Sequence, residues 1–186
     1  MKRETQIIQL IIEGNEQGFI SLYTLYSSKI YSTALSYTKN IEEAEEVTQD
    51  VFVKIFKSIS KFKGESSLNT WVYRITINTS LNYLRKRKRK GLNFFNTPIN
   101  ASDSIDFEHP GVLLENKEHA IILYQVIDGL SHNQKTAFIL SYIEDLPRQE
   151  VADIMETSLK AVESLLQRAK KNMRPELEKI YPFRRK

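Results

Sequence analysis

One predicted helix carries the residues best suited to hold nucleic acid. Counted at about 100° per residue, six side chains fall on one stripe about 80° wide. The stripe consists of Trp71, Arg74, Asn78, Asn82, Arg85 and Arg89. Amide groups can read base edges, an indole can stack on an unpaired base, and guanidinium groups can hold phosphates. The stripe therefore predicts a surface for opened or partly opened DNA.

Most of this stripe also has a structural interpretation. Trp71 lies next to Val72 and could anchor a core, and the six consecutive cations at 85–90 could form a solvated face. Asn78 and Asn82 are harder to explain in this way, because asparagine is a poor residue in the middle of a helix. These two amides are the strongest local indication of function.

The C-terminal half contains a helix-turn-helix pattern. Pro147 suits a first helical position, the segment 156–158 is a short turn, and Ser158 can cap the next helix. The inward positions of this second helix are Val162, Leu165, Leu166, Ala169 and Met173. Its outward positions are Lys160, Glu163, Ser164, Gln167 and Lys171. A row of donors and acceptors that ends in cations suits the major groove of duplex DNA, although a solvated face remains an alternative.

The elements that must position these surfaces are all helical. Apolar residues recur at steps of three and four, which predicts helices over 6–12, 16–39, a segment after Asn40, 66–90, 116–127, 133–143, 147–155 and 159–174. The helix over 16–39 should bury a stripe that includes Leu22, Tyr23 and Tyr26. From 91 to 110 the periodicity fails. We predict an all-α fold with two small helical domains, residues 1–90 and 116–186, joined by a flexible acidic linker at 91–115.

Composition and charge exclude several classes of protein. The 186 residues include 41% apolar residues, which is typical of a folded soluble protein. The net charge of +4 is unevenly spread, because the six cations at 85–90 and a basic segment at 131–186 flank an acidic stretch at 91–130, and such a distribution indicates a polyanion contacted at two places. No cysteine is present, which excludes disulfides and thiolate chemistry. No segment approaches the roughly 20 apolar residues that cross a bilayer, so we expect a cytoplasmic protein without direct membrane insertion.

Neither catalysis nor metal binding is indicated. The three histidines, His109, His119 and His132, lack ligand spacing, and the acidic residues between Glu42 and Asp50 recur along one helix with no histidine nearby. We expect no enzyme activity, no metal and no cofactor.

The order of the motifs resembles the sigma factors of bacterial RNA polymerase, specifically the compact extracytoplasmic-function (ECF) branch. The resemblance covers nearly the whole chain: the matching blocks are EAEEVTQDVFVKIF at 43–56, FKGES at 62–66, TWVYRI at 70–75, Asn78, NYLR at 82–85, LS at 130–131, QK at 134–135 and the helix-turn-helix. Each block is only moderately specific. Their order and spacing make the match strong.

The resemblance implies a role for each block. The residues that would dock on the clamp helices of the largest subunit of core RNA polymerase are Gln49, Asp50, Phe52 and Val53. Those that would contact the minus-ten promoter element are Phe62, Gly64, Ser66, Trp71, Arg74, Asn78, Asn82 and Arg85, with the loop at 62–67 capturing a flipped base. Those that would read the minus-thirty-five element are Lys160, Glu163, Ser164, Gln167, Arg168 and Lys171.

The implied protein is a dissociable initiation subunit that binds promoter DNA, nucleates strand opening and is controlled by an anti-sigma factor. Four positions depart from the family pattern. Glu156 replaces a common turn glycine, Pro147 replaces a capping serine, and Glu163 and Leu165 occupy places that are often basic. One alternative is a conventional helix-turn-helix regulator that binds duplex operator DNA, which leaves the N-terminal blocks unexplained. Another is a basic RNA-binding or scaffold protein that would use the cations at 85–90 without reading bases.

Overall fold

The computed structural model describes residues 2–89 and 117–180, and within these ranges every regular element is a helix. This confirms the predicted all-α class, whereas the predicted linker at 91–115 lies entirely outside the described residues. The chain divides into two compact units, residues 1–97 and 98–186.

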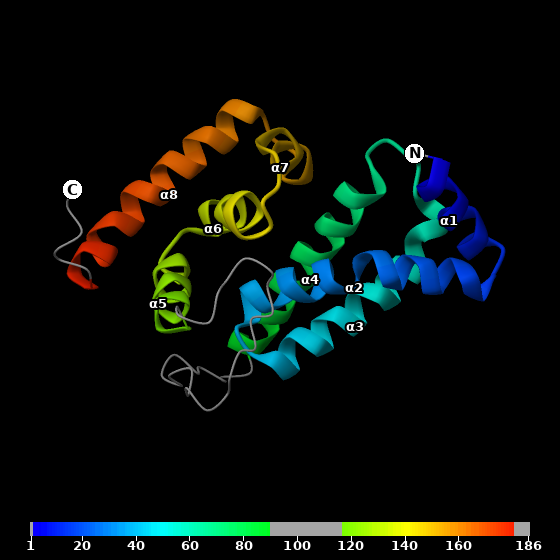
Figure 1. Ribbon diagram of the computed structural model, residues 1–186, viewed down its shortest axis with the longest axis horizontal. Coiled ribbons are helices and arrows are strands. Elements are labelled where there is room, and N and C mark those ends of the chain that lie inside the picture. The colour runs from blue at the N-terminus through cyan, green and yellow to red at the C-terminus, as the bar shows by residue number, and fades with distance from the viewer. Residues whose placement is uncertain (1, 90–116, 181–186) are drawn as a thin grey trace. The chain divides into compact units, whose positions relative to one another are not determined.

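The N-terminal unit is built on three packed helices, α2, α3 and α4 (Figure 1). Its elements are α1 (Lys2–Ile12), α2 (Glu16–Thr38), α3 (Ile41–Ser58), a short 3-10 turn η1 (Ile59–Lys61) and α4 (Leu68–Arg89). Helix α1 packs against α2. The largest fully buried side chains of this unit are Leu22, Ile30, Val47, Val51, Ile55, Leu68 and Val72.

Side-chain caps explain where these helices begin. The Asn15 and Asn40 side chains accept hydrogen bonds from the backbone N–H groups of Gln17 and Glu43, at 2.9 and 2.8 Å. The Ser67 hydroxyl accepts from the backbone N–H of Thr70 at 3.0 Å, so α4 begins at Leu68. Each cap satisfies an N–H group that lacks a partner within its helix.

The C-terminal unit consists of α5 (Lys117–Asp128), α6 (His132–Phe138), a π-helical turn η3 (Ile139–Ile143), α7 (Arg148–Ile154) and α8 (Leu159–Ile180). Helices α5, α6 and α7 each pack against α8. The largest fully buried side chains of this unit are Ile127, Ile139, Leu140, Val151 and Val162.

Two sequence expectations about this unit were wrong. Pro147 occupies the cap position of α7, with an extended ψ of 139°, and is not the first helical residue. Helix α8 does not end at 174, because it continues through Pro175 to Ile180. A proline lacks the N–H donor of other residues, and α8 accommodates Pro175 in its exposed last stretch.

Among the described residues, no helix combines the length and apolar character of a membrane span.

The turn of the helix-turn-helix is strained at Glu156, whose φ is +52°. This left-handed conformation penalises any residue with a Cβ, and glycine avoids that penalty. We expect Glu156→Gly to stabilise the C-terminal unit by about 0.5–1 kcal/mol in urea denaturation followed by circular dichroism.

The control for this substitution is Glu156→Ala, which removes the same carboxylate but keeps the Cβ. If the glycine variant is no more stable than the alanine variant, the strain at Glu156 is not significant.

Candidate nucleic-acid interface

The predicted stripe on α4 lies at the surface of the N-terminal unit. Asn78, Asn82 and Arg85 are exposed, while Trp71 and Arg74 are half-buried. An Arg85 guanidinium N–H donates to Asn82 Oδ1 at 3.3 Å, so these two polar groups form one cluster. Two amides and a cation are therefore available for hydrogen bonds to a ligand.

The opposite face of α4 explains why the stripe faces outward. Val72, Tyr73, Thr76, Ile77 and Ser80 are buried against the rest of the bundle. The Thr76 and Ser80 hydroxyls donate to the carbonyls of Val72 and Thr76, both at 2.9 Å, so both hydroxyls keep a hydrogen bond although they are buried.

The loop before α4 brings an aromatic side chain to the start of the stripe. The Phe62 ring lies 5.2 Å from the Trp71 ring, centroid to centroid, and both side chains are half-buried. Gly64 has a φ of +71° and is exposed, whereas Ser66 is half-buried. Trp71 thus has a packing role as well as a place on the stripe.

The residues assigned to polymerase docking do not all lie at the surface. On α3, Gln49 and Asp50 are exposed and Val53 is 47% exposed, but Phe52 is only 7% exposed. The Phe52 ring packs 5.0 Å from Tyr23 of α2 and 6.4 Å from Phe56, measured between centroids. Phe52 therefore belongs to an aromatic cluster between α2 and α3.

Sequence periodicity missed the outer part of this cluster. Tyr23, expected on the buried stripe of its helix, is 58% exposed, and Phe56 is 36% exposed. The Phe56 ring contacts Phe19 at 4.2 Å. Together with Val53, these side chains place apolar surface beside the exposed polar residues of α3.

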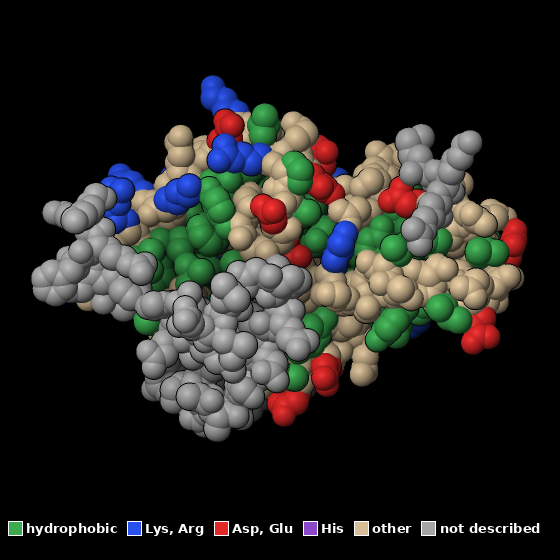
Figure 2. Space-filling view, viewed as in Figure 1, with side chains coloured by type: hydrophobic (Ala, Val, Ile, Leu, Met, Phe, Trp, Pro, Cys, Tyr) green, Lys and Arg blue, Asp and Glu red, His purple; other side chains and the backbone are tan. Residues whose placement is uncertain are grey.

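All six residues predicted to read duplex DNA are exposed on α8. They are Lys160, Glu163, Ser164, Gln167, Arg168 and Lys171. The opposite face buries Val162, Leu166, Ala169 and Met173, as the angular count predicted. Figure 2 shows Lys and Arg side chains along α8. This face of α8 is therefore accessible, and three of its six residues are cations.

Polar side chains cap the second helix of the helix-turn-helix and connect it to the first. The Ser158 hydroxyl accepts from the Ala161 backbone N–H at 3.2 Å, which caps α8 as predicted. Arg148, at the start of α7, lies 3.8 Å from the Glu163 carboxylate. This exposed pair contributes little to stability, but it partly neutralises the only acidic residue among the six.

The sequence pattern did not indicate that two cations, Lys170 of α8 and Arg148 of α7, lie close to Tyr142. The Lys170 ammonium lies 4.8 Å from the centre of the Tyr142 ring. Hydrogen bonding to Lys170, together with the nearby Arg148, lowers the pKa of the Tyr142 hydroxyl below its ordinary value. The residues described show no group of three acidic or histidine side chains placed to hold a metal ion.

Comparisons with known proteins cover both units. Residues 22–90 match the family model for Sigma-70 region 2, and residues 120–173 match the model for Sigma-70, region 4. The chain is 28% identical over 178 residues to the RNA polymerase sigma-H factor of Pseudomonas aeruginosa, which covers 91% of each chain. It is 27% identical over 183 residues to the ECF RNA polymerase sigma-E factor of Haemophilus influenzae, covering 94% and 95% of the two chains.

Solved structures share the fold. A structure of CnrH in complex with the cytosolic domain of CnrY aligns with a TM-score of 0.69 at 18% identity, covering 94% of this chain and 97% of that one. The sigma factor RpoE in complex with the anti-sigma factor NepR from Bartonella quintana aligns with a TM-score of 0.62 at 20% identity, covering 86% and 96%.

The region 2 match accounts for the N-terminal helices that a conventional operator-binding regulator would leave unexplained, and the region 4 match includes the helix-turn-helix. Both matches occur in the order found in relatives that align over nearly their whole length. The chain therefore belongs to the ECF sigma factors of the sigma-70 family, and it directs RNA polymerase to promoters.

Proposed function

We propose that this sigma factor divides its work among three helices. Helix α3 docks on the clamp helices of the largest subunit of core polymerase through Gln49, Asp50 and Val53. Helix α4 and the loop at 62–67 hold the opened minus-ten element, and α8 reads the minus-thirty-five element in the major groove. The observation that supports this division most directly is the exposure of Asn78 and Asn82 opposite the buried face of α4.

Strand opening needs no catalytic group in this proposal. Extruding a base costs a few kcal/mol, and stacking with hydrogen bonds to the base edge can offset that cost. Phe62 and Trp71 offer aromatic surface for stacking, and the two asparagines offer edge contacts. The protein acts as a non-catalytic subunit without a metal or cofactor of its own.

A reconstituted transcription assay tests this division of roles. Core polymerase and the purified chain should together give transcripts from one start site, and neither should do so alone. If the chain instead binds a duplex operator tightly without polymerase and yields no transcript, the operator-binding alternative is correct.

The outward residues of α8 should separate into base-reading and phosphate-holding groups. We expect Gln167→Ala to relax preference at one position of the minus-thirty-five element by about 1–3 kcal/mol, because an amide pairs with a base edge. Lys171→Ala should weaken binding to every sequence alike and reduce the slope of log K against log salt by about one. Competition binding of the holoenzyme to single-position promoter variants measures both effects.

Each of these substitutions serves as the control for the other. Equal loss on all promoter variants for Gln167→Ala, with an unchanged pattern of preference, would contradict its assignment as a base-reading residue.

An anti-sigma factor is a further proposed partner. The two solved relatives described above are bound to CnrY and to the anti-sigma factor NepR. The exposed apolar side chains Tyr23, Val53 and Phe56 offer the N-terminal unit a surface on which such a protein can pack. A partner bound there would cover the docking residues of α3 and keep the chain from polymerase.

A further inference from the structure

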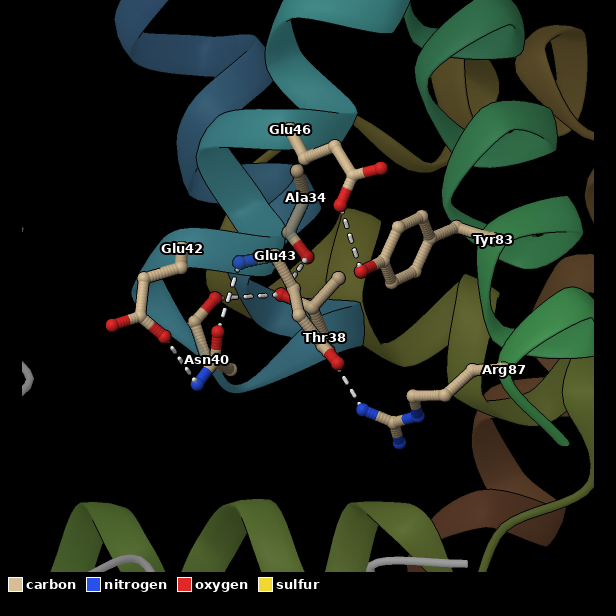
Figure 3. Close-up of polar contacts among 8 residues, drawn as sticks. All are labelled: Ala34, Thr38, Asn40, Glu42, Glu43, Glu46, Tyr83 and Arg87. Atoms are coloured by element: carbon tan, nitrogen blue, oxygen red, sulfur yellow. Dashed lines mark hydrogen bonds and ion pairs between the residues drawn. The ribbon is translucent and has the colours of Figure 1, made fainter. Parts of the chain in front are cut away.

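The far end of α4 is tied to α3 by two polar contacts between residues distant in sequence. The Tyr83 hydroxyl donates to Glu46 Oε2 at 3.0 Å, and Arg87 Nη1 donates to Glu43 Oε2 at 2.7 Å. Figure 3 shows Tyr83 and Arg87 reaching from α4 to the two carboxylates on the first turns of α3. We call these four residues the acidic seam.

The acidic seam lies where α4 no longer buries side chains fully. The buried residues of α4 end at Ser80, and beyond it the helix contributes only half-buried or exposed side chains up to Arg89. One turn before the seam, Lys54 of α3 donates to the Thr79 hydroxyl at 2.9 Å, so polar contacts between the two helices continue toward the seam. The hydrogen bonds to Glu43 and Glu46 therefore help to hold the last turns of α4 to α3, together with the half-buried side chains of Leu81 and Leu84.

The positive charges of residues 85–89 oppose helix formation at the end of α4. Five consecutive cations, residues 85–89, end the described part of α4, and like charges three and four residues apart destabilise a helix. The Arg87 and Glu43 side chains are 31% and 22% exposed, so water screens their attraction less than it would for a fully exposed pair. Burial, with the hydrogen bond to Glu46, also raises the pKa of Tyr83 to about 12, so the hydroxyl remains a donor to Glu46 well above neutral pH.

The acidic seam also sets the direction of the stripe. Tyr83 and Arg87 lie on the side of α4 that faces α3, whereas Asn82 and Arg85 are about 100° or more away around the helix. Asn78 precedes Ser80 and lies in the stretch held by apolar packing. The seam therefore controls the half of the stripe that contains Asn82 and Arg85.

We propose that Tyr83 and Arg87 are positioning residues for promoter opening: through Glu46 and Glu43 they hold Asn82 and Arg85 toward the opened strand. The proposal rests on the function proposed above for α4. It also links the helix that docks on polymerase to the helix that holds DNA, because α3 carries both the seam carboxylates and the docking residues.

A charge exchange across the seam tests this proposal. Arg87→Glu should slow opening of a duplex promoter by saturating holoenzyme about tenfold, whereas the double variant Glu43→Arg/Arg87→Glu should open it within about twofold of the wild type. Lys88→Glu is the matched control, because it makes the same charge change at an exposed position outside the seam and the stripe. Amide hydrogen exchange in residues 81–89 should rise in Arg87→Glu and return in the double variant.

Three results overturn the proposal. The first is that Arg87→Glu opens the promoter no more slowly than Lys88→Glu. The second is that the double variant opens it as slowly as Arg87→Glu, and this result would show that the Arg87 guanidinium itself contacts DNA. The third is unchanged hydrogen exchange in Arg87→Glu. Failure of the function proposed for α4 has a different signature, which is normal opening by Asn82→Ala in the wild-type background.

Discussion

The double substitution Asn78→Ala/Asn82→Ala should slow promoter opening about 100-fold while leaving affinity for core polymerase unchanged. Each amide side chain can make hydrogen bonds to one base edge, and such contacts are worth about 1–3 kcal/mol apiece. Both side chains are exposed, and alanine is a better helix former than asparagine, so α4 should remain intact. Permanganate reactivity of unpaired thymines in the minus-ten element measures the opening rate.

The matched control for this experiment is Asn133→Ala. Asn133 is also an exposed helical asparagine, but it lies on α6 in the C-terminal unit. Equal opening by the double variant and this control would remove the assigned role of the two amides.

The second large effect is expected on α3. Val53→Lys should weaken binding to core polymerase about 100-fold, because it removes apolar contact and places a charge inside the proposed interface. Val53 is 47% exposed, so the substitution should not unfold the bundle. Fluorescence anisotropy of labelled sigma factor titrated with core polymerase gives the affinity, and circular dichroism checks the fold.

A charge placed on exposed apolar surface outside α3 should not weaken binding to core polymerase. Ile12→Lys is the matched control, because Ile12 is 50% exposed on α1, outside the proposed interface. Similar losses in the two variants would show that polymerase binding is not localised to α3.

Phe52→Ala is a poor test of polymerase docking because the Phe52 side chain is buried. The resemblance to sigma factors placed Phe52 among the docking residues, but its ring is 7% exposed and packs on Tyr23. Phe52→Ala removes a buried aromatic ring, and such changes cost about 3–5 kcal/mol of stability. Reduced polymerase binding by that variant would report unfolding as readily as a lost contact.

The arrangement within each helix was predictable from the sequence. The 3.6-residue period places Val162 and Leu166 on one face of α8 and Lys160 and Gln167 on the other, and Asn40 marks the start of α3 through its side-chain cap. These features depend on residues a few positions apart. The same local count correctly predicted that Asn78 and Asn82 share a face of α4.

Features that depend on contacts between helices were not predictable in this way. Tyr83 and Glu46 are 37 residues apart in sequence, and the local pattern around either residue does not predict a contact with the other. The exposure of Tyr23 depends on how α2 meets α3, since periodicity along one helix cannot tell which edge of an apolar stripe a neighbour covers. The left-handed turn at Glu156 was indicated only by the glycine that the family usually has there.

The most direct test of the proposed contact between α4 and the opened minus-ten element is a photocrosslink from α4 to promoter DNA. Asn82 is replaced with a photoreactive amino acid, and the holoenzyme is irradiated on a promoter before and after opening. If Asn82 holds the opened strand, crosslinks to bases of one strand of the minus-ten element should appear only as the strand opens. Crosslinks confined to protein, or identical yields on closed and opened DNA, would contradict it.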